Sequence, residues 1–311
     1  MSSDDTIHDV IMIGAGPAAL TAAIYTSREN IQTLLIEKGV IGGLAAITDQ
    51  IDNYPGFADG VEGLKLAEQL RKQAERFGAK IELDEVIAIE NHKDNKVIKT
   101  HGGVLKARAI LIATGSDYVK LGVPGELEMY GRGVHYCATC DGAFYNDKRL
   151  VTVGAGNSAA QESLFLTRFA NHVDVLIRGE KWKASDVLVE EIDKNDKIDV
   201  HFNTTTEEVV TENNRVVGVR GHDKTTDKDV VFETDGVFPF VGLKPNTQFL
   251  KGSNIMCDDH GFVLSNDDLE TNEKGIFVAG DVRSGATMQI ASAAGEGATA
   301  AMRIREYLEQ K

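Results

Sequence analysis

The sequence predicts an α/β protein with two Rossmann-like dinucleotide-binding domains, because one strand, glycine turn, helix and strand pattern occurs twice in 311 residues. The first glycine turn is at 14–19 and the second at 154–159, each directly after a short apolar run. Between the two repeats lies the pair Cys137 and Cys140, which indicates a redox function. A repeated nucleotide-binding pattern with an intervening dithiol therefore organises the chain.

The first repeat has the full spacing of a dinucleotide fingerprint. An apolar run at 10–13 fits a buried parallel strand, and helical residues follow the turn as far as Arg28. Gly14 permits the tight turn, and Gly16 lets the backbone approach a pyrophosphate. Glu37 stands 37 − 14 = 23 positions after Gly14, where its carboxylate can accept hydrogen bonds from ribose hydroxyls. We therefore expect the first repeat to bind a dinucleotide.

The second repeat keeps the glycines and lacks the acid. The position 177 − 154 = 23 residues after Gly154 is Ile177, and Arg178 comes next. Without a carboxylate to repel it, a ribose 2′-phosphate suits this site, with Lys181 and Lys183 as further cations. The alternative is that these cations are only solvated surface residues.

The remaining pattern predicts a first domain that the chain leaves and re-enters. The other expected elements are strands at 33–36, within 80–105, at 109–114, at 173–177 and at 275–279, helices at 61–77, from 157 to about 169 and from about 288 to 308, and a hairpin turning at 212–215. Segments 116–126 and 237–247 are expected to cross between the domains. We therefore assign 1–117 and 245–311 to the first domain, which is discontinuous in sequence, and 118–244 to the second.

The composition is that of an ordinary globular protein, with 42% hydrophobic and 26% charged residues. The 33 basic and 48 acidic residues give a net charge of −15 without a basic stripe, which argues against nucleic acid and anionic membrane as partners. We expect no export signal and no membrane span. Three cysteines do not make a disulfide framework, so we expect a reducing, cytoplasmic location.

The dithiol predicts thiol–disulfide exchange. Two residues separate Cys137 from Cys140, so a small disulfide can close, and this motif tends to lower the pKa of the attacking thiol. Asp141 can hold or deliver a proton. The alternative is half of a zinc site, but Cys257 and His135 do not supply a complete second pair of ligands. We therefore expect a redox site and no metal.

Together these motifs resemble the low-molecular-weight thioredoxin reductases, over almost the whole chain. The string Cys-Ala-Thr-Cys-Asp at 137–141, shortly before the second glycine turn, is highly specific. The other matching motifs are, in order, Gly14-Ala15-Gly16-Pro17-Ala18, Asn53-Tyr54-Pro55-Gly56, Ala113-Thr114-Gly115, Gly154-Ala155-Gly156 and Ala279-Gly280-Asp281-Val282. With the resemblance we expect both Rossmann-like domains to have the three-layer ββα form.

The resemblance implies FAD at the first glycine turn and NADPH at the second. Asp281 at a strand end can hold a cofactor hydroxyl, and the first turn of the last helix can direct its dipole at an electron-rich ring. The residues expected to bind FAD are Gly14, Gly16, Pro17, Ala18, Glu37, Lys38, Gly43, Leu44, Asn53, Val86, Ala113, Gly115, Gly280, Asp281, Gln289, Ile290 and Ala291. The residues expected to bind NADPH are Gly154, Gly156, Asn157, Ser158, Arg178 and Lys183.

The resemblance also implies a reaction and an assembly. Hydride passes from the nicotinamide to the flavin, and the reduced flavin opens the disulfide between Cys137 and Cys140. Cys140 is implied to face the flavin, Cys137 to attack the disulfide of a thioredoxin-like partner, and Asp141 to supply or accept the proton. A homodimer is implied, in which the nucleotide domain rotates so that the dithiol meets the flavin and the partner in turn.

The second domain departs from the family pattern. The family usually has an acid at the position of Asn157, a glutamate at that of Gln161 and several arginines within 177–183, and an arginine where Met288 stands. NADH, a ferredoxin or a second flavin are therefore alternative donors. A peroxiredoxin or a glutaredoxin-like protein is an alternative acceptor. A function of another class, an FAD-binding redox sensor without turnover, also stays open.

Overall fold

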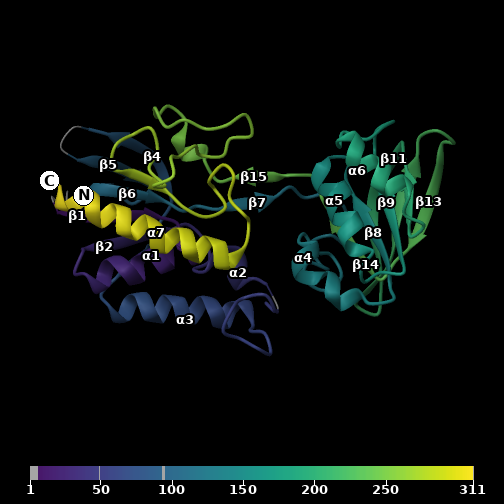
Figure 1. Ribbon diagram of the computed structural model, residues 1–311, viewed down its shortest axis with the longest axis horizontal. Coiled ribbons are helices and arrows are strands. Elements are labelled where there is room, and N and C mark those ends of the chain that lie inside the picture. Colours follow the sequence, from purple (N-terminus) through teal and green to yellow (C-terminus); the bar gives the residue numbers. More distant parts are fainter. Residues whose placement is uncertain (1–5, 49, 93–94, 311) are drawn as a thin grey trace. The chain divides into compact units, whose positions relative to one another are not determined.

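The computed structural model describes residues 6–48, 50–92 and 95–310, in two compact units (Figure 1). Unit 1 comprises Met1–Asp117 and Lys244–Lys311, and unit 2 comprises Tyr118–Leu243. The chain leaves unit 1 along β7 (Ser116–Tyr118) and returns along β15 (Leu243–Pro245), and these two strands pair with each other. The chain therefore crosses between the units twice, on adjacent strands.

A seven-stranded sheet that forks at one strand is the centre of unit 1. Its strands are β1 (Ile7–Ile13), β2 (Thr33–Glu37), β3 (Lys80–Leu83), β4 (Val86–Asn91), β5 (Lys96–Thr100), β6 (Val104–Ile112) and β16 (Ile276–Val278). β3, β2, β1 and β6 are parallel neighbours in that order. β1 pairs with β6 along one side, and β5 and β16 both pair with β6 along its other side. The antiparallel β5–β4 pair takes the start of β6, and the parallel β16 takes its end.

Both faces of this sheet are buried, which explains why its strands read as unbroken apolar runs. Val10 and Met12 pack against three helices, α1 (Pro17–Arg28), α3 (Gly63–Arg76) and α7 (Ile290–Glu309). Ile11 and Ile13 pack on the opposite face, with side chains of β4 and β5. Figure 1 shows the three helices on one side of the sheet, with α7 in yellow. Two shorter helices, α2 (Gly43–Ala46) and η2 (Gln248–Leu250), complete unit 1.

Small residues let α1 and α7 approach closely. A Cβ atom added at Gly297 of α7 would lie 2.2 Å from the carbonyl oxygen of Ala18 in α1. Both positions are buried. Because backbone meets backbone at this contact, any larger residue at position 297 would push the helices apart.

Unit 2 repeats the parallel part of the fold with a smaller sheet. Its parallel strands are β10 (Ile198–His201), β9 (His172–Leu176), β8 (Arg149–Val153) and β14 (Gly236–Pro239), in that spatial order, and an antiparallel sheet contains β11 (Thr204–Glu212), β12 (Arg215–Asp223) and β13 (Lys228–Glu233). Val151 and Val237 pack with side chains of β11 and β12, whereas Leu150 and Phe238 pack on the helix side. The helices are α4 (Ala138–Asp141), η1 (Gly142–Tyr145), α5 (Asn157–Leu166) and α6 (Asp186–Asp193).

The prediction of an α/β fold with two Rossmann-like domains, the first discontinuous in sequence, is confirmed. Local expectations differ from the structure at two places. Val237 to Pro239 belong to the buried strand β14 rather than to a crossing. α5 ends at Leu166, before the expected 169, in a turn where Arg168 and Phe169 donate to carbonyls three residues back. The helix α6 was not anticipated.

Candidate functional site

The first glycine turn joins β1 to α1 and leaves room for an anion. Gly14 has φ = +101°, and a Cβ there would lie 2.4 Å from the carbonyl oxygen of Ala113. Gly16 is the N-cap of α1, a Cβ on it would meet nothing within 4 Å, and no side chain caps the helix. Pro17 and Ala18 begin the helix. A phosphate could therefore approach these uncapped first-turn amides.

Glu37 lies at the end of β2, beside this turn. Its two carboxylate oxygens accept hydrogen bonds from the backbone amides of Ala15 and Gly39, each at 2.7 Å. A pocket of unit 1 adjoins the carboxylate. Four residues expected to bind FAD contribute to its lining: Gly14, Glu37, Lys38 and Val86. The arrangement fits the adenosine half of a dinucleotide, because a carboxylate held in this way keeps free lone pairs for ribose hydroxyls.

The expected residues around α2 and after β6 also lie at this turn. A Cβ on Gly43, the first residue of α2, would lie 3.7 Å from the Cα atom of Gly16, and Leu44 comes next in the helix. Ala113 donates its amide to the carbonyl of Ile13. Gly115 has φ = +65° and accepts a hydrogen bond from the amide of Asn246.

A second set of expected FAD residues gathers at the start of α7. The side-chain amide of Asn53 donates to Oε1 of Gln289 at 3.1 Å, although the two are 236 positions apart in the sequence. Gln289 is the N-cap of α7 without capping it, and Ile290 and Ala291 open the helix. Met288 has φ = +57°, a conformation that costs a residue with a side chain of order 1 kcal/mol.

Asp281 is a largely buried carboxyl just after β16. Burial, and the neighbouring charge of Glu296, raise its pKa to about 6. Glu296 itself accepts a hydrogen bond from the amide of Gly280 at 2.8 Å and pairs with Arg283 at 2.6 Å. A buried carboxyl next to another acid is costly without a donor, and a cofactor hydroxyl would be one. The residues present in unit 1 therefore fit FAD.

The second glycine turn repeats the geometry of the first. A Cβ on Gly154 would lie 2.4 Å from the carbonyl oxygen of Phe240, and one on Gly156 would meet nothing within 4 Å. Gly156 is the uncapped N-cap of α5, whose first residues are Asn157 and Ser158. The side chain of Asn157 accepts from the amide of Ser185 at 2.8 Å. These residues fit a pyrophosphate.

The cations expected to bind a 2′-phosphate are exposed. Arg178 follows β9, and Lys183 lies close to the glycine turn because its amide donates to the carbonyl of Ala155 at 2.8 Å. Among the described residues, neither side chain has a carboxylate partner. Both are therefore available to a phosphate, although each is also free to move in solvent.

The two cysteines expected to react form a disulfide, with their Cα atoms 5.3 Å apart. Cys137 is the N-cap of α4, and its Sγ accepts a hydrogen bond from the amide of Cys140 at 3.2 Å. Both are half-buried, and Asp141 ends the same helical turn. An amide that donates to Sγ would stabilise a thiolate at Cys137 after reduction. The remaining cysteine, Cys257, is an exposed free thiol in unit 1.

Sequence reasoning missed the two side chains that extend this site. Nδ1 of His135 lies 3.2 Å from Oδ2 of Asp141, and its Nε2 is hydrogen-bonded to the hydroxyl of Tyr145 at 2.7 Å. Burial, and the charge of Asp141, raise the pKa of Tyr145. His135 was considered only as a zinc ligand. The available signal was the position of both residues within a few places of the dithiol.

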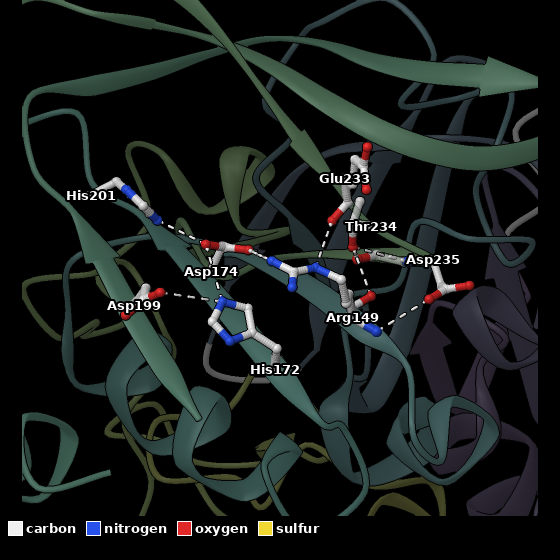
Figure 2. Close-up of polar contacts among 9 residues, drawn as sticks. Arg149, His172, Asp174, Asp199, His201, Glu233, Thr234 and Asp235 are labelled. Carbon is white, nitrogen blue, oxygen red and sulfur yellow. Dashed lines mark hydrogen bonds and ion pairs between the residues drawn. The ribbon is translucent and has the colours of Figure 1, made fainter. Parts of the chain in front are cut away.

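Figure 2 shows a second polar cluster in unit 2, around Asp174. Its carboxylate lies 3.3 Å from Arg149 and 2.8 Å from His201, and His172 lies 3.4 Å from Asp174 and 3.5 Å from Asp199. Within the described ranges, His172, Asp174 and Asp199 are the one acid and histidine group close enough to suggest a cation. The guanidinium of Arg149 already balances Asp174, so we interpret the cluster as ion pairs that link β8, β9 and β10.

Comparisons with known proteins agree with this description. Residues 8–297 match the model of the pyridine nucleotide-disulphide oxidoreductase family. A thioredoxin reductase of Bacillus subtilis is 42% identical over 308 residues, which are 99% of this chain and 97% of that protein. One of Listeria monocytogenes is 41% identical over 310 residues, 100% of this chain and 97% of that protein.

A solved structure gives the same result. The crystal structure of thioredoxin reductase from Streptococcus pyogenes has a TM-score of 0.94 at 37% identity, and the match covers 99% of this chain and 100% of that one. Among the described residues, no helix is long and apolar enough to cross a membrane. The chain belongs to the pyridine nucleotide-disulphide oxidoreductase family and, within it, to the low-molecular-weight thioredoxin reductases.

Proposed function

We propose that this protein passes two electrons from NADPH, through FAD, to the disulfide between Cys137 and Cys140, and from the resulting dithiol to a disulfide in a thioredoxin-like protein. The observation that carries the proposal is the half-buried disulfide, with Asp141 beside it, in the unit that also holds the second glycine turn. Both glycine turns fit a pyrophosphate. The relatives named thioredoxin reductase match over nearly their whole length.

Membership of the family implies FAD and a pyridine nucleotide as cofactors. We assign FAD to unit 1, where Glu37 and Asp281 would hold its hydroxyl groups, and the pyridine nucleotide to unit 2, at Gly154 and Gly156. When bound, FAD supplies the two-electron chemistry that connects a nicotinamide donor with a disulfide. The protein contributes position, charge and the exchange of protons.

Cys137 and Cys140 have different roles in this proposal. After reduction, the amide of Cys140 stabilises the Cys137 thiolate, which attacks the disulfide of the partner. Cys140 then closes the disulfide again, and Asp141 exchanges the proton. A Cys137→Ser variant should lose reduction of thioredoxin while NADPH still bleaches its flavin. Cys257→Ser, which changes an exposed thiol of unit 1, is the matched control and should turn over normally. Normal thioredoxin reduction by Cys137→Ser would refute these roles.

The electron donor is tested by anaerobic titration of the purified yellow protein with NADPH and, separately, with NADH. Rapid bleaching of the flavin by NADPH alone would support the 2′-phosphate site at Arg178 and Lys183. An Arg178→Ala variant should then need roughly tenfold more NADPH, with no change for NADH. Bleaching by NADH would show that the donor site accepts a nucleotide without a 2′-phosphate. Bleaching by neither would direct the search to a ferredoxin or a reduced flavin.

Four further parts of the proposal have their own checks. A homodimer should show in the mass measured by light scattering. The free thiol of Cys257 and a cycling disulfide suit a reducing compartment, so we keep the cytoplasm as the proposed location, testable by fractionating the source cells. Steady turnover with a thioredoxin would exclude a redox sensor. A faster reaction with a peroxiredoxin or a glutaredoxin-like protein would change the acceptor.

A further inference from the structure

We propose that His135 is a positioning residue of the exchange site, and that it forms with Asp141 an imidazole–carboxylate pair that stores the proton exchanged with the dithiol of Cys137 and Cys140. The inference rests on the proposed function, since it takes Asp141 as the acid and base of thiol–disulfide exchange. It adds a residue that lies outside the Cys-Ala-Thr-Cys-Asp string.

Three neighbouring side chains hold the imidazole of His135 in place. Its side chain is 8% exposed, and its ring stacks on Phe238 with 5.4 Å between the centroids. Nε2 is hydrogen-bonded to Tyr145 at 2.7 Å, and Nδ1 lies 3.2 Å from Asp141. The carboxylate is itself only 15% exposed. Both ring nitrogens therefore have a partner, and one of the partners is the acid next to Cys140.

The partners determine where the protons are. An ionised carboxylate can only accept, so Nδ1 carries the proton when the imidazole is neutral, and Nε2 then accepts from the hydroxyl of Tyr145. Tyr145 keeps its proton because burial, Asp141 and Asp235 raise its pKa. If a second proton enters at Nε2, the same hydroxyl can rotate and accept. The pair can therefore take up a proton without moving its heavy atoms.

Charged and titratable groups from several elements bear on the pair. Asp141 comes from α4 and Tyr145 from η1, and Asp235 follows β13 and acts on Tyr145. Tyr130 faces Asp141, whose charge adds to the effect of burial in raising the tyrosine pKa. The face toward β14 is the apolar ring of Phe238. A cation also lies in this region, because Nζ of Lys120 is 4.7 Å from the ring centroid of Tyr130 and 3.9 Å from that of Tyr136.

Contact with His135 should make Asp141 part of a more effective proton acceptor. A free carboxyl titrates near pH 4, whereas a free imidazole titrates near pH 6.5, and general acid–base catalysis is most effective when the group titrates near the working pH. A lone carboxylate would accept a thiol proton poorly at pH 7. An imidazole in contact with it can hold that proton as an imidazolium, next to a negative charge.

Protons and electrons balance in the exchange reaction when the pair of His135 and Asp141 holds the proton. The Cys137 thiol gives its proton to the pair, its thiolate forms a bond to one sulfur of the substrate disulfide, and that S–S bond breaks. The departing sulfur takes the proton back from the pair. Cys140 then loses its proton by the same route and displaces the second substrate sulfur. The dithiol is oxidised by two electrons and the substrate disulfide is reduced by two.

The test is the pH profile of one half-reaction. Holoprotein reduced with dithiothreitol and freed from it is mixed with excess bis(2-hydroxyethyl) disulfide between pH 5.5 and 8.5, and closure of the Cys137–Cys140 disulfide is followed by acid quench and alkylation. His135→Gln should react about tenfold more slowly at pH 7 and lose the inflection that the pair produces in the wild-type profile. Tyr145→Phe, which removes the hydroxyl partner of Nε2, should shift that inflection without abolishing it. His222→Gln, which changes a histidine of β12 that contacts Asp229, is the control and should match the wild type.

A His135→Gln profile that runs parallel to the wild type across the pH range, at any rate, would overturn the proposal, because a purely structural role would lower the rate equally at every pH. If His135→Gln does not fold, an unchanged Tyr145→Phe profile would overturn it. The probe needs neither a nicotinamide nor a protein partner. A wild type that shows the inflection but does not reduce thioredoxin with NADPH would refute the proposed function and leave this inference standing.

Discussion

Replacing Asp281 with asparagine should stabilise the flavin-free protein and weaken its binding of FAD. The carboxyl is largely buried just after β16, and burial and the charge of Glu296 raise its pKa to about 6 from an ordinary 3.8. An ionised carboxylate is therefore unfavourable in the flavin-free fold. Asparagine has nearly the same shape and does not ionise, so it removes this cost.

The magnitude follows from the two pKa values of Asp281. They differ by about two pH units, or about 3 kcal/mol at 1.36 kcal/mol per unit. Between pH 4 and 6 the folded state binds a proton that the unfolded state does not, so this contribution to stability falls as the pH rises through that range. The wild type bears the whole cost at pH 7.5 and about half of it at pH 5. Asp281→Asn should therefore be more stable by up to about 3 kcal/mol at pH 7.5 and about 1.5 kcal/mol at pH 5.

Binding should change in the opposite direction. Loss of a charged acceptor for a cofactor hydroxyl costs about 1.5 kcal/mol, which is roughly a tenfold weaker affinity for FAD. Urea unfolding of flavin-free protein at the two pH values measures the first effect, and quenching of FAD fluorescence measures the second. Asp267→Asn removes an exposed charge from the same unit and should change neither. A variant of Asp281 that is no more stable at pH 7.5, or that binds FAD as tightly as the wild type, would refute the reasoning.

Two predictions concern stability. Asp174→Asn should lower the free energy of unfolding at pH 7 by about 2 kcal/mol, measured by urea titration. Burial of Asp174 acts to raise its pKa, but the hydrogen bond from His201 and the histidine charges lower it below the ordinary value. This stabilisation is therefore present at neutral pH and lost as the pH falls below about 4, so equal destabilisation at pH 3 would contradict it. Gly297→Ala should cost about 1–3 kcal/mol because its Cβ would lie 2.2 Å from the Ala18 carbonyl. Gly295→Ala, where a Cβ meets nothing within 4 Å, should instead stabilise α7 by up to about 1 kcal/mol; the same sign for both glycine variants would contradict the packing argument.

Features that depend on residues close together in the chain could be predicted from the sequence. Gly14 and Gly154 were predictable because a tight turn next to a strand needs a residue without a side chain, and a Cβ at either would strike a carbonyl oxygen. The disulfide between Cys137 and Cys140 follows from a spacing of three. Glu37 was found by its distance from Gly14, although only the structure shows the amides that hold it.

Contacts between distant segments could not be predicted in this way. Gly236 of β14 pairs with Leu150 of β8, 86 positions earlier, so nothing nearby distinguished a core strand from a crossing. The cluster around Asp174 draws its partners from three strands of the sheet. A local fold can also escape a reading of the sequence: α4 turns the chain so that Asp141 meets Nδ1 of His135, and η1 then brings Tyr145 to Nε2. A histidine in a sequence does not reveal which of its two nitrogens has a partner.

The two nucleotide sites differ in how far the protein itself holds the polar side chains that are expected to contact the ligand. Glu37 is held by two amides at 2.7 Å, and Gln289 is held by Asn53 at 3.1 Å, so little freedom is left for FAD to remove. In unit 2 the side chain of Asn157 is also held, by the amide of Ser185 at 2.8 Å, but the cations Arg178 and Lys183 are exposed and have no carboxylate partner among the described residues. Ordering each of them on binding costs about 0.5–1.5 kcal/mol. FAD should therefore stay with the protein through gel filtration while a pyridine nucleotide dissociates, as a substrate must. Co-elution of stoichiometric NADP with the protein would contradict this argument.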